Sequence, residues 1–294
     1  MSPQNLSFSK LIKACERSLK NLKTDYLDLY QIHWPNPAIP LTETCEALNK
    51  LYQEGKIRAI GVSNFGCQDL QKILKENMRI VTNQLPYSLL FRAIEYEILP
   101  LCQKKKIGIL CYSPLMQGLL TGKFKSAKEV PATRARTRHF SYRRPFTRHG
   151  EKGCEKLTFS TVNKLGQVSK KLKLPLGQLA IAWLLHQPGV KSVIVGARSP
   201  KQIKENAVAT RIKLTPSVLE ELNKLGEKPS TFLVGLCGEL LVKSKLLENG
   251  IPFISKGGGQ AGFDIMLKNG KKIEVRTSLL KNEGIYPKDI MFYG

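Results

Sequence analysis

Hydrophobic and polar residues follow two alternating patterns over the first 226 residues. Short apolar runs predict buried strands over residues 26–32, 57–62, 80–85, 107–112 and 192–195. Apolar residues at helical spacing predict amphipathic helices over residues 11–22, 41–53, 68–75, 93–104, 158–171, 176–186, 200–209 and 216–225. Strands that alternate with helices indicate parallel βα units, so the pattern predicts an α/β fold.

The expected architecture is an incomplete (β/α)8 TIM barrel, because the chain has about five of the eight βα units that close such a barrel. Three further units would occupy roughly 90 residues upstream. A sheet of five parallel strands leaves two apolar edges open, which natural proteins avoid. Three explanations compete: a misassigned start codon or frameshift, a degraded remnant, and a partner chain or oligomer that covers the open edge. The first two are favoured, since the open edge gives a fragment no obvious stability.

The pattern changes after the last of these helices, so we place a domain boundary near residue 228. The barrel domain then covers residues 1–228, and a small α+β appendage covers residues 229–294. The appendage has a predicted helix over residues 232–247 and two short strands over residues 263–267 and 272–276, joined by the turn Asn269-Gly270. Such a hairpin does not belong to a parallel barrel.

The composition is that of an ordinary globular protein, with 42% hydrophobic residues. No apolar run is long enough to span a bilayer, and the polar N-terminus does not resemble a secretory signal. The seven cysteines lack CxxC pairing, which favours reduced, mostly buried thiols over a disulfide framework. We therefore expect a cytoplasmic protein with no membrane partner.

The net charge is more informative. Forty-seven Lys and Arg against 23 Asp and Glu give +24, a balance that attracts polyanions. Part of it lies in a loop that interleaves arginines with aromatics: Arg134, Arg136, Arg138, Phe140, Tyr142, Arg143, Arg144, Phe146 and Arg148. Arginines and aromatic rings can grip phosphates and stack on bases, so nucleic acid is one candidate partner. A phosphate-rich cofactor is the other, and it is favoured because charge runs are unspecific.

Polar and aromatic residues follow each predicted strand at the point where the strand ends. The first strand ends at His33, within the segment Asp25-Tyr-Leu-Asp-Leu-Tyr-Gln-Ile-His33-Trp-Pro35. The later strand ends are Gly61-Val-Ser63-Asn64-Phe65, Asn83-Gln84-Leu-Pro-Tyr87-Ser88, Tyr112-Ser113-Pro114-Leu115 with Gln117, and Gly196-Ala-Arg198. Because the carboxyl ends of parallel strands line one face of a barrel, these residues are expected to form a site.

In this order the segments resemble the aldo-keto reductase family, and the resemblance runs from about residue 6 to residue 226. It implies an NADP-dependent oxidoreductase that transfers hydride between NADPH and a small carbonyl substrate. It also implies that Ser63, Asn64 and Gln84 hold the nicotinamide carboxamide, while Tyr112 covers one face of the ring. Further implied contacts to the pyrophosphate come from backbone N–H groups of Ser113, Leu115 and Gln117.

The resemblance places the adenosine end of NADP at the last strand and the helix after it, in a loop that contains Gly196. A helix that opens at Pro200 presents free N–H groups and a positive dipole end to a phosphate. Arg198 can grip the 2′-phosphate with its guanidinium fork. The implied adenosine contacts are Gln202, Glu205 and Asn206. The alternative for Gln202 and Asn206 is solvated helix surface, and the complete set of strand-end segments favours the cofactor contacts.

The chain departs from the family in its catalytic residues. The family mechanism uses a tyrosine as general acid, whose pKa is lowered by a lysine that an aspartate holds. The resemblance places all three on strands before the first one present here, which leaves His33 to orient and polarise the carbonyl. We therefore expect impaired carbonyl reduction by these residues alone.

The appendage carries a second resemblance, to the PD-(D/E)xK nuclease-like core. Asp264 and Glu274 lie on the two strands of the predicted hairpin, where two carboxylates can converge on Mg²⁺. Arg276 stands at the position of the family's lysine and does not release a proton near neutral pH. The alternatives left open are a decayed or incomplete nuclease fold and a surface hairpin with solvated acids. A nucleic-acid-associated protein is thus the alternative function.

Overall fold

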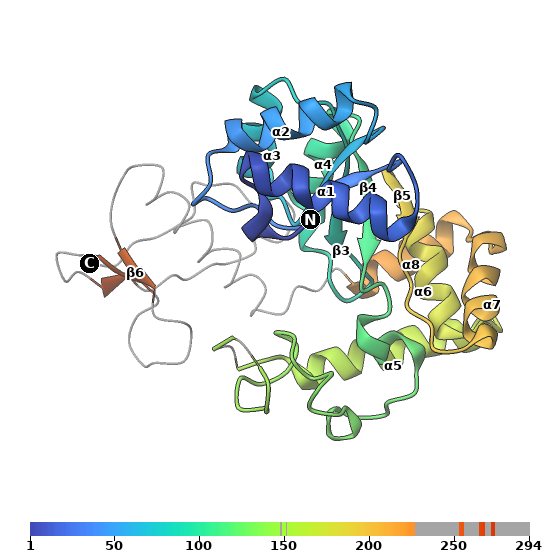
Figure 1. Ribbon diagram of the computed structural model, residues 1–294. Coiled ribbons are helices and arrows are strands. Elements are labelled where there is room, and N and C mark those ends of the chain that lie inside the picture. The colour runs from blue at the N-terminus through green and yellow to red at the C-terminus, as the bar shows by residue number, and fades with distance from the viewer. Residues whose placement is uncertain (148, 151, 227–252, 256–264, 268–271, 274–294) are drawn as a thin grey trace. The chain divides into compact units, whose positions relative to one another are not determined.

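The computed structural model describes residues 1–147, 149–150, 152–226, 253–255, 265–267 and 272–273 (Figure 1). The chain divides into two compact units. The first unit combines Met1–Met116 with Leu174–Glu220, and the second combines Gln117–Lys173 with the described residues from Glu221 onward. All five predicted barrel strands belong to the first unit.

The first unit is built on five parallel strands that pair in the order of the chain. The strands are β1 (Tyr30–Ile32), β2 (Ile60–Ser63), β3 (Ile80–Pro86), β4 (Gly108–Tyr112) and β5 (Val190–Val193). The predicted α/β fold with five βα-type strands is therefore confirmed. Within the described residues β1 and β5 form the two edges of this sheet, so the part of the barrel that the structure describes is not closed.

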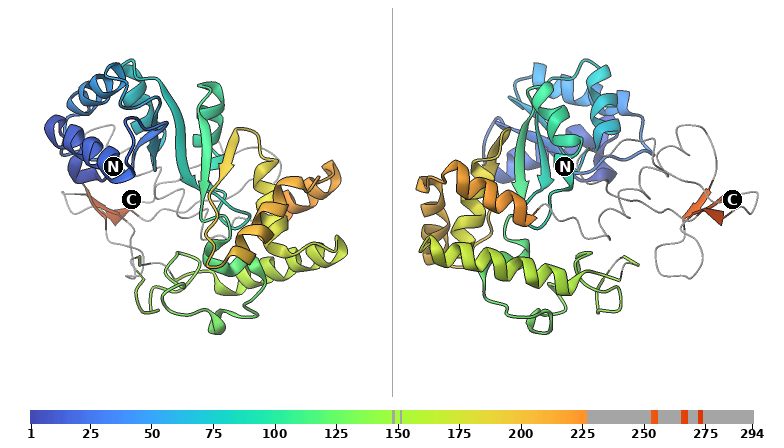
Figure 2. Two further views of the ribbon diagram at one scale, coloured as in Figure 1. Left: turned by 45° about the vertical axis from the view of Figure 1, so that its right-hand side comes forward. Right: turned by 180° about the vertical axis from the view of Figure 1, so that it is seen from behind.

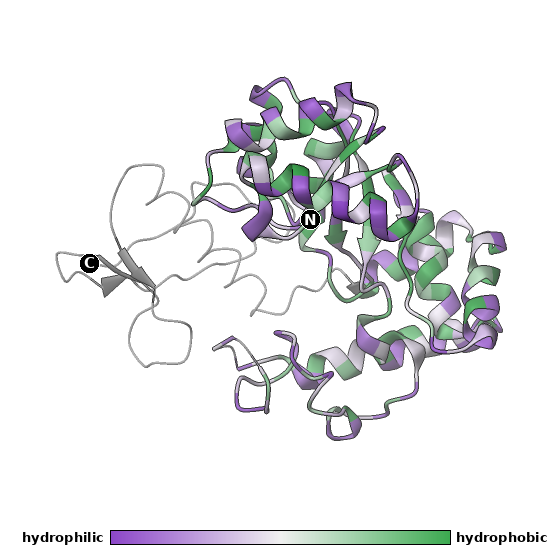
Figure 3. Ribbon diagram, in the orientation of Figure 1, coloured by the Kyte–Doolittle hydropathy of each residue, from purple (hydrophilic) through white to green (hydrophobic). Residues whose placement is uncertain are grey.

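Helices precede, connect and follow these strands. In the first unit they are α1 (Phe8–Leu22), α2 (Leu41–Gln53), α3 (Cys67–Lys75), α4 (Ile98–Lys104), α6 (Leu176–Leu185) and α7 (Pro200–Val208), and α8 (Pro216–Gly226) begins there. Figure 2 shows the blue helices α1, α2 and α3 gathered beside the strands. Figure 3 shows α6 as a largely hydrophobic helix, and seven of its ten residues are buried. Burial of such faces is the main stabilising contribution to a layered α/β unit.

Several predicted elements have bounds that differ by a few residues, and two strands and one helix are among them. The strand expected over residues 26–32 begins at Tyr30, because a bend at Asp28, a residue type that disfavours strands, leaves only an isolated bridge from Leu27 to Ile57. The helix expected over residues 93–104 is divided into η2 (Ala93–Glu95) and α4, since Glu97 has non-helical backbone angles. The strand expected over residues 192–195 begins at Val190 instead.

The two faces of the sheet differ in character. One face is almost entirely buried and apolar, and it includes Tyr30, Ile32, Val62, Leu85, Ile109 and Cys111. The other face carries the half-buried polar side chains of Gln31 and Thr82. The parallel register places these two residues on either side of Gly61. The next row toward the carboxyl ends places Ser63 beside Gln84. This polar face leads directly to the strand ends on which the sequence places the candidate site.

The second unit contains the basic loop and the helix after it. Apart from three short strands after residue 250, its described elements are η3 (Met116–Thr121), which starts at the last residue of the first unit, η4 (Ala127–Glu129), α5 (Glu155–Lys171) and the end of α8. Helix α5 buries an apolar stripe of Phe159, Val162, Leu165 and Val168, at the spacing of one helix face.

The appendage is described only in its short strands. These are β6 (Phe253–Ser255), β7 (Ile265–Leu267) and β8 (Lys272–Ile273), which pair antiparallel in the order β6-β7-β8. The predicted antiparallel pairing between the last two strands is confirmed at Ile265 with Ile273 and at Met266 with Lys272, and the other residues of the two predicted strands lie outside the described residues, apart from Leu267. The helix predicted over residues 232–247 lies outside the described residues, and the boundary near residue 228 stays a prediction.

Two further sequence expectations concern cysteines and membranes. All six cysteines that the structure describes are free, and burial raises the pKa of the Cys45 and Cys111 thiols to about 12. These two thiols are therefore protonated and unreactive near neutral pH. None of the described helices has the length and apolar character that a membrane-spanning helix needs.

Candidate functional site

The ends of three strands are joined through the side chain of Asn64. Its Oδ1 accepts a hydrogen bond from the Tyr112 hydroxyl at 2.8 Å, and its Nδ2 donates to Ser63 Oγ at 3.0 Å and to the His33 backbone oxygen at 3.1 Å. Asn64 has a φ of 60°, a left-handed conformation that asparagine tolerates better than most residues. The amide therefore fixes the carboxyl ends of β1, β2 and β4 relative to one another.

Gln84 completes this arrangement from β3. Its backbone oxygen accepts from the Ser63 hydroxyl at 3.0 Å and from the Asn64 backbone N–H at 3.0 Å. Its side-chain Oε1 accepts from Gln31 Nε2 at 2.9 Å. Ser63 is 3% exposed, so its hydroxyl is a buried polar group that has found both a donor and an acceptor.

His33 and Tyr112 stand at opposite ends of this row. The His33 side chain is exposed, and its ring centroid lies 6.4 Å from that of Trp34. Tyr112 is half-buried, and burial raises the pKa of its hydroxyl above the ordinary value. The Tyr112 hydroxyl thus stays protonated near neutral pH, as its donation to Asn64 requires.

The loop after β4 turns sharply. Ser113, Met116, Gln117 and Gly118 all have left-handed φ values between 44° and 101°, and the Met116 N–H donates to the Ser113 oxygen at 3.0 Å. Ser113 and Leu115 are half-buried in the first unit, whereas Gln117 is exposed and begins the second unit. A run of left-handed residues turns successive backbone N–H groups toward one side, which suits an anion.

Helix α7 begins with a complete N-terminal cap. The Ser199 side chain accepts from the Gln202 N–H at 3.3 Å, and Pro200 occupies the first turn, where its missing N–H is not needed. Gln202 Oε1 in turn accepts from the Arg198 backbone N–H at 2.8 Å. The side chains of Arg198 and Glu205 are exposed and Asn206 is half-buried, while Gln178 of α6 donates to the Glu205 oxygen at 2.9 Å. Gly196 is exposed in the loop that precedes the cap.

The structure therefore brings five predicted site residues into one hydrogen-bonded group: His33, Ser63, Asn64, Gln84 and Tyr112. The other predicted residues of the first unit lie on the loop after β4 and around the start of α7.

The family model of the aldo/keto reductase family matches residues 1–227. The chain belongs to the aldo/keto reductase family. Among its relatives, aldo-keto reductase YhdN of Bacillus subtilis strain 168 is 34% identical over 228 residues, which are 77% of this chain and 66% of that protein. The NADH-specific methylglyoxal reductase of Escherichia coli strain K12 is 32% identical over 236 residues, covering 76% and 66%. This chain thus spans about two-thirds of the length of these relatives.

A solved structure supports the same assignment. The crystal structure of an aldo/keto reductase from Klebsiella pneumoniae, in complex with NADP and acetate, matches with a TM-score of 0.59 at 30% identity. The match covers 78% of this chain and 69% of that one. The expected family and its barrel-type fold are confirmed, and the roles assigned to individual residues stay predictions.

Two residues beside the candidate site were given no individual role from the sequence. Gln31 joins Gln84 to the Thr82 hydroxyl, which donates to Gln31 Oε1 at 3.1 Å. Asn83 is fully buried, and its Nδ2 donates to the Phe65 oxygen at 3.0 Å in the loop after Asn64. One signal was available, because Gln31 is a polar residue between two apolar strand residues and two positions before His33.

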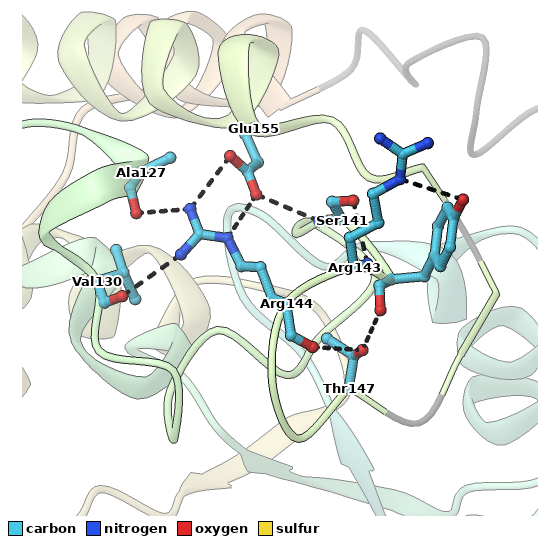
Figure 4. Close-up of polar contacts among 8 residues, drawn as sticks. Ala127, Val130, Ser141, Arg143, Arg144, Thr147 and Glu155 are labelled. Carbon is cyan, nitrogen blue, oxygen red and sulfur yellow. Dashed lines mark hydrogen bonds and ion pairs between the residues drawn. The ribbon is translucent and has the colours of Figure 1, made fainter.

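One arginine of the basic loop in the second unit, Arg144, forms hydrogen bonds within the protein. Arg144 donates to both oxygens of Glu155, at 2.7 Å and 3.2 Å, and to the backbone oxygens of Ala127 and Val130 (Figure 4). Its guanidinium carbon lies 4.9 Å from the centroid of the fully buried Phe140 ring. Hydrogen bonds from Arg144 lower the pKa of Glu155 below its ordinary value.

The rest of the loop is more open. Arg136, Arg138, Arg143, Tyr142 and Phe146 are exposed, and Arg143 donates to the Tyr142 hydroxyl at 3.3 Å. Arg134 is half-buried, and Arg148 lies outside the described residues. The interpretation of the loop as a nucleic-acid surface therefore depends on fewer residues than the sequence suggested.

The expected metal pair, Asp264 and Glu274, lies outside the described residues, as does Arg276. Within the part of the chain that the structure describes, no group of three or more His, Cys, Asp and Glu side chains could hold a metal ion.

Proposed function

We propose that this chain binds a nicotinamide dinucleotide, with NADP favoured over NAD, across the strand ends and the start of α7. The observation that carries the proposal is the hydrogen-bonded group of Ser63, Asn64, Gln84 and Tyr112 at the carboxyl ends of β2, β3 and β4. Family membership supports it, as does the structural neighbour solved with NADP. One relative is named an NADH-specific methylglyoxal reductase, so family membership alone does not decide between the two dinucleotides.

The residues present fit such a cofactor in their donor chemistry. Side-chain amides and a hydroxyl at the strand ends match a carboxamide, which both donates and accepts hydrogen bonds. The half-buried ring of Tyr112 offers an aromatic face to the nicotinamide, whose chemistry when bound is hydride transfer. The amides of Asn64 and Gln84 are already held by neighbouring groups, so their positions do not have to be ordered on binding.

The opposite end of the dinucleotide is assigned to the segment from Gly196 to Asn206. The start of α7 offers the positive end of the helix dipole to phosphate, although the Gln202 N–H already donates to Ser199. The exposed Arg198 guanidinium can reach a 2′-phosphate, which NADP carries and NAD lacks. Backbone groups of Ser113, Leu115 and Gln117 are assigned to the pyrophosphate.

The proposed reaction class is reduction of a small carbonyl compound, to which His33 would donate a hydrogen bond. The exposed His33 side chain at the end of β1 can orient and polarise a carbonyl oxygen. It does not replace the tyrosine acid and its lysine and aspartate, which the family resemblance places on other strands. We therefore propose that the 294 residues bind cofactor well but reduce carbonyl compounds poorly by themselves.

Fluorescence titration tests the cofactor proposal. NADPH is expected to bind the 294-residue chain at least about tenfold more tightly than NADH. This is the affinity ratio expected from one charge-assisted hydrogen bond to phosphate. Equal affinities would overturn the preference for NADP, and absence of binding by either dinucleotide would overturn the site. Robust turnover of a simple aldehyde with NADPH would contradict the proposed impairment.

A second candidate, nucleic-acid binding, rests on the exposed arginines and aromatics of the basic loop and on the charge of +24. Binding of this kind weakens steeply as salt rises, because counterions are released from phosphates. Gel-shift titrations with single-stranded DNA at several salt concentrations test it, with Arg136→Ala and Arg143→Ala as variants. Affinity that the two variants leave unchanged would exclude the loop. The nuclease version predicts Mg²⁺-dependent cleavage that Asp264→Ala abolishes.

A further inference from the structure

The Gln31 side chain links those of Thr82 and Gln84 on the polar face of the sheet, and Gln84 belongs to the predicted nicotinamide pocket. Its Nε2 donates to Gln84 Oε1 at 2.9 Å, and its own Oε1 accepts from the Thr82 hydroxyl at 3.1 Å. The three side chains come from β1 and β3, with β2 between these strands. We propose that Gln31 is a positioning residue, which holds the Gln84 amide where it meets the carboxamide of the cofactor. The inference rests on the function proposed above and adds a residue to it.

The backbone of β2 makes room for this connection. Gly61 lies between Gln31 and Thr82 in the parallel register, and it has no side chain of its own. A Cβ at Gly61 would overlap the Thr82 hydroxyl and would lie 3.0 Å from two atoms of the Gln31 side chain. A glycine at this position is therefore what allows two side chains to meet across an intervening strand.

The connection fixes the free end of a flexible side chain. A glutamine has three rotatable side-chain bonds, and the Gln84 amide sits on the half-buried polar face, where packing alone does not immobilise it. Both polar atoms of the Gln31 amide form hydrogen bonds, because its oxygen accepts from Thr82 while its nitrogen donates to Gln84. Tyr30 and Ile32, on either side of Gln31, are buried on the opposite face and keep its direction constant.

Two ligands distinguish a positioning role of Gln31 from a general effect of this residue on the fold. NADP⁺ has the nicotinamide, whereas adenosine 2′,5′-bisphosphate has only the adenosine end. For Gln31→Met, which keeps length but removes both hydrogen bonds, we expect about fivefold weaker NADP⁺ binding, the size of one lost neutral hydrogen bond. Binding of the bisphosphate should stay within about twofold of the wild type, because this ligand does not include the group that meets Gln84.

Thr82 provides the matched control. Thr82→Ser keeps the hydroxyl and should retain NADP⁺ affinity, while Thr82→Val removes the hydroxyl at nearly constant volume and should lower that affinity. Calorimetric titration of the four proteins with both ligands, alongside their thermal unfolding, gives the result. Unchanged NADP⁺ affinity in Gln31→Met, or equal weakening of both ligands, overturns the inference. If the wild type itself binds NADP⁺ no more tightly than the bisphosphate, the assigned nicotinamide pocket fails first, and the role of Gln31 fails with it.

Discussion

The Tyr112 hydroxyl donates to Asn64 Oδ1 across 2.8 Å, and this contact links the end of β4 to the end of β2 past the intervening β3. The same amide reaches the His33 backbone at the end of β1. One side chain therefore sets the spacing between the aromatic ring that we assign to the nicotinamide and the histidine that we assign to the carbonyl. A contact of this kind makes the site's geometry depend on Asn64 as well as on the residues that face the ligand.

Removing only the Tyr112 hydroxyl distinguishes the effect of its hydrogen bond to Asn64 from the effect of its ring on the nicotinamide. Tyr112→Phe keeps the ring and loses the bond to Asn64, so we expect a loss of about 1 kcal/mol in the free energy of unfolding and a reduction of NADPH affinity of about fivefold or less. Tyr112→Ala also loses the aromatic face and should weaken NADPH by at least about tenfold. Chemical denaturation and fluorescence titration measure both quantities. Equal NADPH affinity in the two variants would show that the ring does not contact the nicotinamide.

Arg198 is expected to discriminate between dinucleotides. Arg198→Ala should weaken NADPH by about tenfold or more, the cost of losing a charge-assisted hydrogen bond to phosphate, and should leave NADH within about twofold. Arg211→Ala is the matched control, because Arg211 is an exposed arginine in η5, directly after α7. Loss of NADPH binding in both variants would point to the general positive field of the protein instead of a specific contact.

Gly61→Ala should destabilise the fold and disturb the pocket together. The new Cβ would overlap the Thr82 hydroxyl and crowd Gln31, and overpacking of this kind costs about 1–3 kcal/mol. Gly66→Ala is the control, since a Cβ there meets no atom within 4 Å. Thermal unfolding is expected to show a lower midpoint for Gly61→Ala only, and similar midpoints for the two variants would contradict the close approach of Gln31 and Thr82.

The pair of Arg144 and Glu155 gives a prediction about pH. Because the pKa of Glu155 in the folded protein is below its ordinary value of 4.5, this carboxylate adds stability that is fully present above about pH 4.5 and is lost as the pH falls through the lowered pKa. Glu155→Gln should cost about 1–2 kcal/mol near neutral pH, with a smaller difference from the wild type below pH 4. Denaturant unfolding across this range measures it.

The control for this pair is Glu221, which lies 3.8 Å from Lys171 with both side chains well exposed. Glu221→Gln should change the free energy of unfolding by less than about 0.5 kcal/mol, since exposed ion pairs contribute little. If Glu155→Gln behaves in the same way, Arg144 does not hold the basic loop in place.

The fold followed from the sequence where hydrophobic periodicity decides it. Helix α2 was predicted with the bounds that it has, since five of its side chains are buried at helical spacing. The strand ending at His33 was predicted too long, because an apolar run does not show where Asp28 interrupts the pairing. Periodicity reports which residues are buried, and it says less about where a ladder begins.

The site was predictable only as a set of strand ends. Family resemblance placed Ser63, Asn64, Gln84 and Tyr112 on neighbouring strands, but the role of Gln31 depends on register across three strands. Charge along the sequence did not distinguish Arg144, which is paired with Glu155, from the exposed arginines around it. That pairing joins a loop residue to the first residue of α5, eleven positions later, where neither helix nor strand spacing applies.

The central claim is that a nicotinamide dinucleotide binds at the strand ends around Asn64 and Gln84. Nuclear magnetic resonance of the side-chain amides tests it most directly, with NADP⁺ added to the chain labelled at Asn and Gln. The account predicts that the Asn64 and Gln84 amide signals shift on addition, while Gln103, whose amide donates to the Pro188 oxygen at 2.8 Å, stays unchanged. Shifts confined to other amides, or no shifts at saturating NADP⁺, would contradict it.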